Sequence, residues 1–142
     1  MEDLCDNIIE IRLYLGGIYM GGFIRSEVER EETSTLNTAI NNEVYENFKS
    51  YCKRYGYPMN IIVELFMSKF IDEQIAIDIN KTIELSKDVK DKSPFSTTIN
   101  KKLHQDFKLY CKSNGYKING AITVFMDMFS NGKFAVELVE LE

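Results

Sequence analysis

Apolar and polar residues alternate with a period of two over residues 35–40 and again over residues 94–99. This period, with its β-branched content, predicts two short strands that each bury one face. The expected inner residues are Leu36, Thr38 and Ile40 in the first strand and Phe95, Thr97 and Ile99 in the second. The expected outer residues are Thr35, Asn37, Ala39, Ser96 and Thr98.

A helical period follows each predicted strand. Asn41 and Asn100 are favourable N-cap residues, and Gly56 and Gly115 can take the left-handed conformation that ends a helix. The apolar positions between these limits are Val44, Phe48, Tyr51, Cys52 and Tyr55, and then Leu103, Phe107, Tyr110 and Cys111. Further helices follow, which are apolar on most sides and must therefore be buried on several. Their expected N-caps are Asn60 and Asn119.

These two stretches are copies of one unit. The sequence FKSYCKRYGY at residues 48–57 returns as FKLYCKSNGY at residues 107–116, 59 positions later. The same register carries residues 36–81 onto 95–140 without a gap. A unit of about 46 residues is close to the size at which a separate core becomes marginal. We therefore expect the two copies to share a core that contains Phe48, Phe66, Phe107 and Phe125, with Cys52 and Cys111 beside them.

The pattern divides the chain into four parts. These are an extension over residues 1–33, a first repeat over 34–85, a linker over 86–93 and a second repeat over 94–142. Three alternating stretches outside the helices predict an accessory sheet. They are residues 8–15, 74–80 and 134–141. The glycines within residues 15–23 do not have the spacing of a phosphate-binding loop, and they predict a turn with an adjoining strand.

The net charge of −5 is unevenly distributed. Residues 1–33 carry −5, whereas residues 34–71 carry +1 and residues 94–129 carry +3, so the repeats are mildly basic and the overall charge does not exclude a nucleic-acid partner. Cys52 and Cys111 occupy equivalent positions without a CxxC spacing, which predicts free core thiols in a reducing compartment. The longest uncharged stretch near the N-terminus is too short to cross a bilayer. We expect a cytoplasmic protein without a membrane segment.

No set of residues in the sequence predicts catalysis. His104 is the single histidine, and it is expected on the polar, exposed side of a helix among lysines and glutamine. It has neither a neighbouring nucleophile nor a second metal ligand. The sequence therefore predicts a protein that is not an enzyme and that uses neither a cofactor nor a metal.

The order of strand, Asn-capped helix, glycine turn and apolar helix resembles the ribbon-helix-helix family of DNA-binding proteins. The resemblance covers residues 35–70 and 94–129. In that family two copies pair their strands into an antiparallel ribbon above a core of four helices, and the ribbon enters the major groove. The resemblance implies an α+β fold in which two ribbon-helix-helix repeats form one pseudo-dimer within the chain. Strand 35–41 would pair antiparallel with strand 94–100, and the flanks would add short accessory strands.

The resemblance also implies a function, a sequence-specific repressor or a DNA-organising accessory factor. The expected base-reading residues are Thr35, Asn37, Ala39, Ser96 and Thr98. The expected phosphate-anchoring residues are Asn60, Lys101, Lys102, Lys117 and Asn119. Since the two strands differ, the expected site is non-palindromic, and its A·T richness follows from the Asn, Thr and Ala readers. The alternative is an inhibitor or adaptor that keeps the fold and binds a protein through its flanking strands. Association of pseudo-dimers into larger assemblies stays open.

Overall fold

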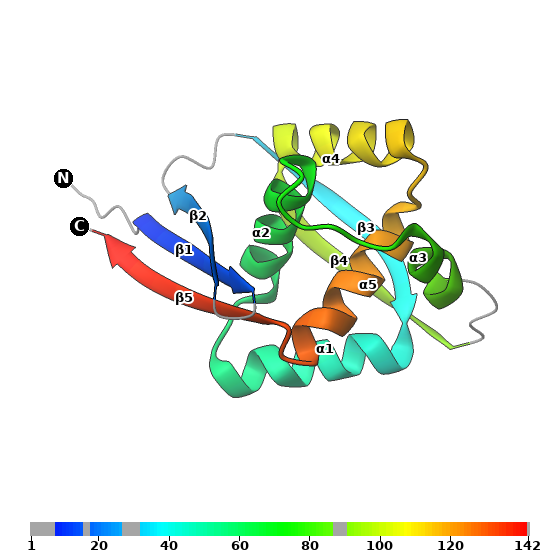
Figure 1. Ribbon diagram of the computed structural model, residues 1–142, viewed down its shortest axis with the longest axis horizontal. Coiled ribbons are helices and arrows are strands. Elements are labelled where there is room, and N and C mark those ends of the chain that lie inside the picture. The colour runs from blue at the N-terminus through cyan, green and yellow to red at the C-terminus, as the bar shows by residue number, and fades with distance from the viewer. Residues whose placement is uncertain (1–7, 16–17, 27–31, 87–90, 142) are drawn as a thin grey trace.

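The computed structural model describes residues 8–15, 18–26, 32–86 and 91–141, and these form an α+β structure (Figure 1). The strands are β1 (Ile8–Leu15), β2 (Ile18–Ser26), β3 (Thr33–Asn41), β4 (Lys92–Asn100) and β5 (Phe134–Leu141). The helices are α1 (Asn42–Tyr55), α2 (Met59–Ile71), α3 (Ile79–Ser86), α4 (Lys101–Asn114) and α5 (Ile118–Ser130). The strands form two small antiparallel sheets, β2-β1-β5 and β3-β4.

The two-stranded sheet joins the two repeats. Asn37 of β3 lies opposite Ser96 of β4, and these residues are repeat equivalents, since they are 59 positions apart. The predicted antiparallel pairing is confirmed, and both strands begin two residues earlier than expected. The ladder continues at both ends, because Asn42 N–H donates to the Asp91 carbonyl at 3.0 Å and Lys101 N–H donates to the Glu32 carbonyl at 3.1 Å. Each end of this ribbon therefore leads directly into a helix.

The limits of α1 and α4 are set as the sequence predicts. The side-chain oxygen of Asn41 accepts from Val44 N–H at 3.1 Å, and that of Asn100 accepts from Leu103 N–H at 2.9 Å. Gly56 ends α1 with a φ of 72° and Gly115 ends α4 with a φ of 77°, a region that only glycine adopts without strain.

The helices of the two repeats are interleaved around one core. α1 packs against α5 and α2 packs against α4, so each first helix meets the second helix of the other repeat. At the centre the rings of the equivalent residues Phe66 and Phe125 stack at 4.4 Å with planes 17° apart. The contact of Phe48 with Phe129 at 5.7 Å is matched by that of Phe107 with Phe70 at 6.1 Å.

The contents of this core agree with the prediction. The four expected phenylalanines and both repeat cysteines are at most 1% exposed. Tyr55 is an exception to the expected apolar positions, because 53% of its surface is exposed. It lies in the last turn of α1, where its ring stacks on Tyr57 at the edge of the core.

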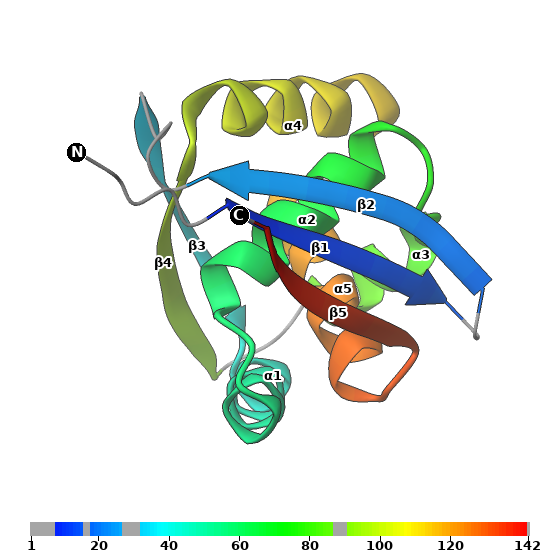
Figure 2. The same cartoon turned by 90° about the vertical axis from the view of Figure 1, so that its left-hand side faces the viewer.

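The flanks break the symmetry between the repeats. The sheet β2-β1-β5 lies beside α2 (Figure 2), whereas α3 packs against α5 on the opposite side. The expected strands over residues 8–15 and 134–141 are present as β1 and β5, and the strand expected next to the glycines is β2. The turn expected at residues 16–17 lies outside the described residues.

The strand expected over residues 74–80 is wrong. This segment is not paired with any described strand, and α3 begins within it at Ile79. Ile75 and Ile77 are nevertheless buried, and the Tyr116 hydroxyl donates to the Ile77 carbonyl at 3.1 Å, as the equivalent Tyr57 donates to the Val136 carbonyl at 3.2 Å. The alternation in residues 74–80 therefore indicates a buried face and not a paired strand. In the three-stranded sheet, β1 pairs with β5 on one edge and with β2 on the other.

The linker expected over residues 86–93 overlaps the ends of both neighbouring elements. α3 extends to Ser86 and β4 begins at Lys92, while residues 87–90 lie outside the described part of the chain.

α3 reaches its place on α5 because Gly120 has no side chain there. A Cβ atom at Gly120 would stand 2.8 Å from the carbonyl oxygen of Thr82.

Candidate nucleic-acid interface

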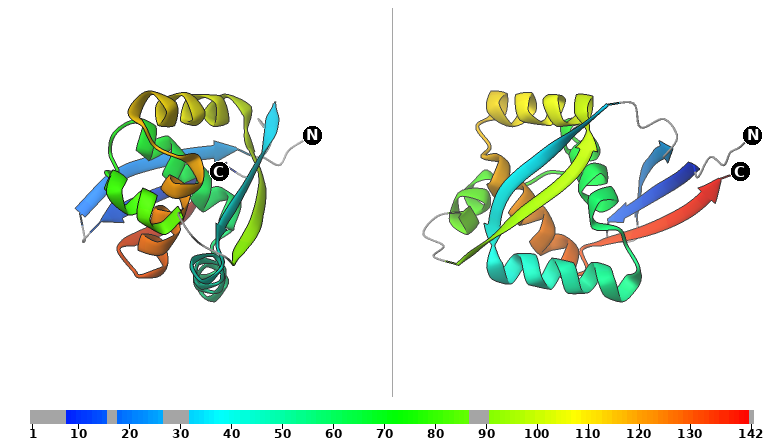
Figure 3. Two further views of the ribbon diagram at one scale, coloured as in Figure 1. Left: turned by 90° about the vertical axis from the view of Figure 1, so that its right-hand side faces the viewer. Right: turned by 180° about the vertical axis from the view of Figure 1, so that it is seen from behind.

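The outer face of the β3–β4 ribbon is polar and uncovered. Seen from behind, both strands lie in front of the four repeat helices, and no described element crosses them (Figure 3, right). The exposed outer residues are Thr33, Thr35, Asn37 and Ala39 on β3 and Lys92, Pro94, Ser96, Thr98 and Asn100 on β4. All five predicted base-reading residues are therefore brought together on one surface.

Four members of this face are absent from the expected outer residues, namely Thr33, Lys92, Pro94 and Asn100. Lys92 is the only charged residue among the exposed outer residues, and Pro94 is the repeat equivalent of Thr35. Both could have been found by continuing the period of two and the repeat register toward the start of each strand. The five expected outer residues are all uncharged, so Lys92 adds a positive charge at one end of the ribbon.

The second helices begin beside the ribbon without a side-chain cap. α5 packs near β3 and α2 near β4. Pro58 and Lys117 occupy the N-cap positions, and neither side chain bonds to the helix. The predicted capping by Asn60 and Asn119 is wrong, because both residues already lie inside the first turn. The preceding turn sets this start, since the Tyr57 and Tyr116 amides donate to the carbonyls of Cys52 and Cys111.

The predicted phosphate-anchoring residues do not form one cluster. Lys101 and Lys102 are exposed in the first turn of α4, where Lys102 pairs with Asp106 at 3.0 Å. Lys117 is exposed at the N-cap position of α5, and Asn119 is half-buried in the first turn of that helix. Asn60 lies at the start of α2, on the other side of the ribbon. Four of the five predicted residues therefore belong to repeat two.

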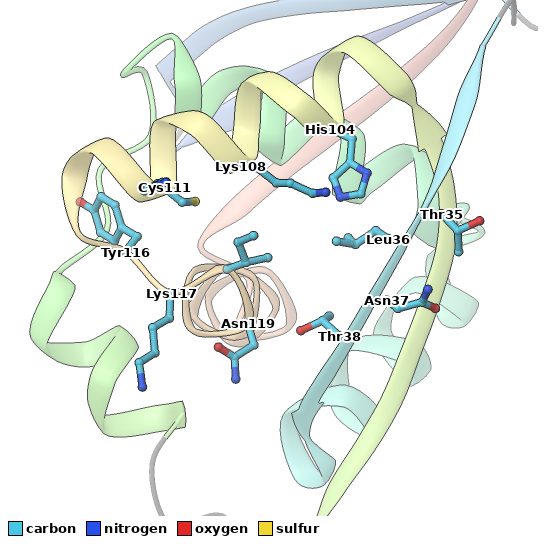
Figure 4. A pocket seen from close by; sticks show the side chains of 12 residues that line it. Thr35, Leu36, Asn37, Thr38, His104, Lys108, Cys111, Tyr116, Lys117 and Asn119 are labelled. Atoms are coloured by element: carbon cyan, nitrogen blue, oxygen red, sulfur yellow. The ribbon is translucent and has the colours of Figure 1, made fainter.

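An open groove of about 720 Å³ runs between β3, α4 and the start of α5 (Figure 4). Its walls carry three lysines and no acidic residue. The polar and charged lining residues are Thr35, Asn37, Thr38, His104, Lys108, Lys112, Tyr116, Lys117 and Asn119. The groove meets the ribbon at the edge of β3, where Figure 4 shows Leu36 and Thr38 directed toward the groove and Thr35 and Asn37 directed to the other face of the strand.

His104 lies in the wall of this groove, so its predicted exposure is wrong. Only 6% of its surface is exposed, and its Nδ1 is hydrogen-bonded to the Ser34 hydroxyl. The spacing could have revealed this, because His104 is three residues before Phe107 and seven before Cys111, on the same helical face. Burial lowers the pKa of His104 below its ordinary value, and the positive charge of Lys108 lowers it further. Figure 4 shows the Lys108 ammonium directed toward the imidazole.

The equivalent place in repeat one is built from larger side chains. Tyr45 stands where repeat two has His104, and Phe95 stands where β3 has Leu36. The rings of Tyr45 and Phe95 are in contact at 5.9 Å. Two aromatic rings thus occupy the position that an imidazole and a leucine occupy beside the groove.

The remaining candidate chemistry in the described part of the chain is that of the core thiols and of possible metal ligands. Burial raises the pKa of the Cys52 and Cys111 thiols to about 12, so neither is a thiolate at neutral pH. Within the described ranges, no three histidine, cysteine or acidic side chains gather as metal ligands would. Among those same residues, no helix combines the length and apolar character needed to cross a membrane.

Comparisons of the chain with protein-family models, with curated proteins and with solved structures found no match. The functional interpretation of the ribbon and its groove therefore depends on their geometry and chemistry.

Proposed function

We propose that the chain is a single-chain ribbon-helix-helix protein that binds double-stranded DNA. The observation that carries the proposal is the β3–β4 ribbon, whose polar outer face is uncovered and whose centre pairs the equivalent residues Asn37 and Ser96. A two-stranded ribbon fits the major groove of B-DNA, where the four base pairs present different donors and acceptors. In the cell the protein would act as a repressor or as a DNA-organising accessory factor.

Each part of the interface has a chemical role in this proposal. Asn37 can bond to both edge groups of adenine, Ser96 and Thr98 can donate or accept, and Ala39 can contact a thymine methyl. Thr35 and Lys92 extend the contacts toward the ends of the ribbon. The uncapped first-turn amides of α2 and α5 favour phosphate, because helix N-termini present N–H groups and a positive dipole.

Binding selection from random duplex DNA tests this function. We expect a preferred site that is rich in A·T and is not a palindrome, since the facing strands carry different side chains. Affinity should fall steeply with salt, as it does when phosphate contacts release counterions. The double substitution Asn37→Ala and Thr98→Ala should change the preferred sequence while the salt dependence stays the same. Selection of a perfect palindrome, or unchanged preference in the double variant, would contradict reading by the ribbon.

A second candidate function is protein binding through the sheet β2-β1-β5. Within the described residues, β2 and β5 each pair on one side only, with β1, so each leaves an edge to which a partner strand could add. Absence of salt-dependent binding to any duplex would make this candidate the leading one.

A further inference from the structure

The two sides of the ribbon differ in charge. Residues 101–117, which form α4 and lead into α5, contain five lysines and one aspartate, for a net charge of +4. The equivalent residues 42–58 contain three basic and two acidic residues, for a net charge of +1. The pseudo-symmetric fold thus presents a strongly basic flank on the side of repeat two and a nearly neutral flank on the side of repeat one.

The two flanks also differ in shape. On the side of repeat two the groove of about 720 Å³ extends from the ribbon edge, with Lys108, Lys112 and Lys117 in its walls. On the other side the contacting rings of Tyr45 and Phe95 occupy the corresponding position. Space and positive charge therefore occur together on one side of the ribbon.

The geometry points to a specific occupant. We propose that this groove holds the sugar-phosphate backbone of one DNA strand, so that the chain anchors the duplex mainly on the repeat-two side. The inference rests on the proposed function and adds Lys108 and Lys112 to the contact surface. These lysines are one turn apart on α4, about 5–6 Å between Cβ atoms, and can contact neighbouring phosphates of one strand. The groove borders the edge of β3, the strand whose outer face carries Asn37, so a DNA backbone held there would belong to the duplex that the ribbon reads.

The pseudo-symmetry supplies matched controls for a test. Lys49 and Lys53 of α1 are the repeat equivalents of Lys108 and Lys112, and all four are exposed. One variant carries Lys108→Gln with Lys112→Gln, and the control carries Lys49→Gln with Lys53→Gln. Both remove the same charge from the same turns of equivalent helices. Circular dichroism should show that both keep the fold, since exposed substitutions rarely destabilise a domain.

The affinity of each protein for the selected duplex is measured by fluorescence anisotropy over a series of salt concentrations. Loss of two phosphate contacts should reduce the slope of log affinity against log salt by about 2 in the groove variant. The control variant should keep the slope of the unsubstituted protein. A hydroxyl-radical footprint should also show protection of the backbone that extends further on one side of the site.

The possible results separate this inference from the proposed function. Equal changes in the two variants, or no change in the groove variant, would overturn one-sided anchoring while DNA binding stands. A chain that binds no duplex in a salt-dependent way would overturn the proposed function and this inference together.

Discussion

Phe66→Ala tests whether the repeats depend on one core. Phe66 has no exposed surface, and its ring contacts Phe70 of its own repeat at 5.2 Å. It also contacts two rings of the other repeat, Phe125 at 4.4 Å and Phe107 at 6.0 Å. Removing a buried phenylalanine costs about 3–5 kcal/mol. A domain is stable by only about 5–15 kcal/mol, so we expect the free energy of unfolding to fall by a large fraction of its total.

A double-mutant cycle isolates the contact between the repeats. Phe66→Leu and Phe125→Leu keep the site apolar but remove the stacking of the equivalent rings. Aromatic pairs contribute about 0.5–1.5 kcal/mol beyond the area that they bury, so the two substitutions should couple by that amount. The control cycle combines Phe66→Leu with Tyr45→Leu, since Tyr45 packs on Phe95 at the edge of the core. These two changes should add.

Urea unfolding followed by far-ultraviolet circular dichroism measures these energies, because the chain has no tryptophan to report by fluorescence. We expect every variant to unfold in one transition, since α1 packs on α5 and α2 on α4. Two refuting results are clear. One is a Phe66→Ala variant that unfolds in two steps, with repeat two still folded after repeat one is lost. The other is additivity of Phe66→Leu and Phe125→Leu.

Three further predictions follow from single residues. Because burial raises the pKa of the Cys52 and Cys111 thiols to about 12, a thiol reagent should label neither in the native protein, and mass spectrometry of the peptides should find label only after denaturant is added. Because burial lowers the pKa of His104 in the folded state, the unfolded state takes up a proton first, and stability should fall as the pH drops through about 6.5 and level off below the folded value. Urea unfolding at several pH values measures this dependence. If the free energy of unfolding of a His104→Gln variant fell with pH as steeply as that of the unsubstituted protein, the reasoning would be contradicted. Gly120→Ala should lower the Tm, because a Cβ atom 2.8 Å from the Thr82 carbonyl outweighs the gain of about 1 kcal/mol in helix propensity; an increase in Tm would show that α3 is not held closely on α5.

The sequence predicted the ribbon and its first helices because local chemistry determines them. Asn41 and Asn100 cap whatever helix follows, and Gly56 and Gly115 end it by adopting a positive φ. The start of the second helix depends instead on the geometry of the turn. The tyrosine amides bond back to the preceding helix, so the cap position falls on Pro58 and Lys117 whatever their side chains offer.

Pairing between strands was harder to predict than burial. Residues 74–80 alternate in the same way as residues 133–139, and Ile75 and Ile77 are buried as expected. Alternation identifies a buried face but does not identify a partner edge. β2 follows β1 almost directly in sequence, so a short loop brings it to the edge of β1 at a low entropic cost. The third strand of this sheet is therefore β2, the sequence neighbour of β1, and not residues 74–80.

The groove depends on differences between the repeats, which a search for similarity passes over. The residues that are identical at equivalent positions include Phe48 and Phe107, Phe66 and Phe125, and Cys52 and Cys111. These six residues lie in the core, where the rings of Phe66 and Phe125 stack on each other.

Where the repeats differ, the molecule gains features that a symmetric dimer cannot have. In a homodimer, a smaller residue at the position of His104 or Leu36 would open both flanks equally, and an added lysine would charge both. A single chain can change one copy alone. Space opens beside His104 while Tyr45 and Phe95 occupy the equivalent place, and α3 docks at Gly120 where the equivalent residue of α2 is Ile61. Joining the two halves therefore gives the molecule two unlike flanks, and under the proposed function such an interface would distinguish the two ends of a DNA site.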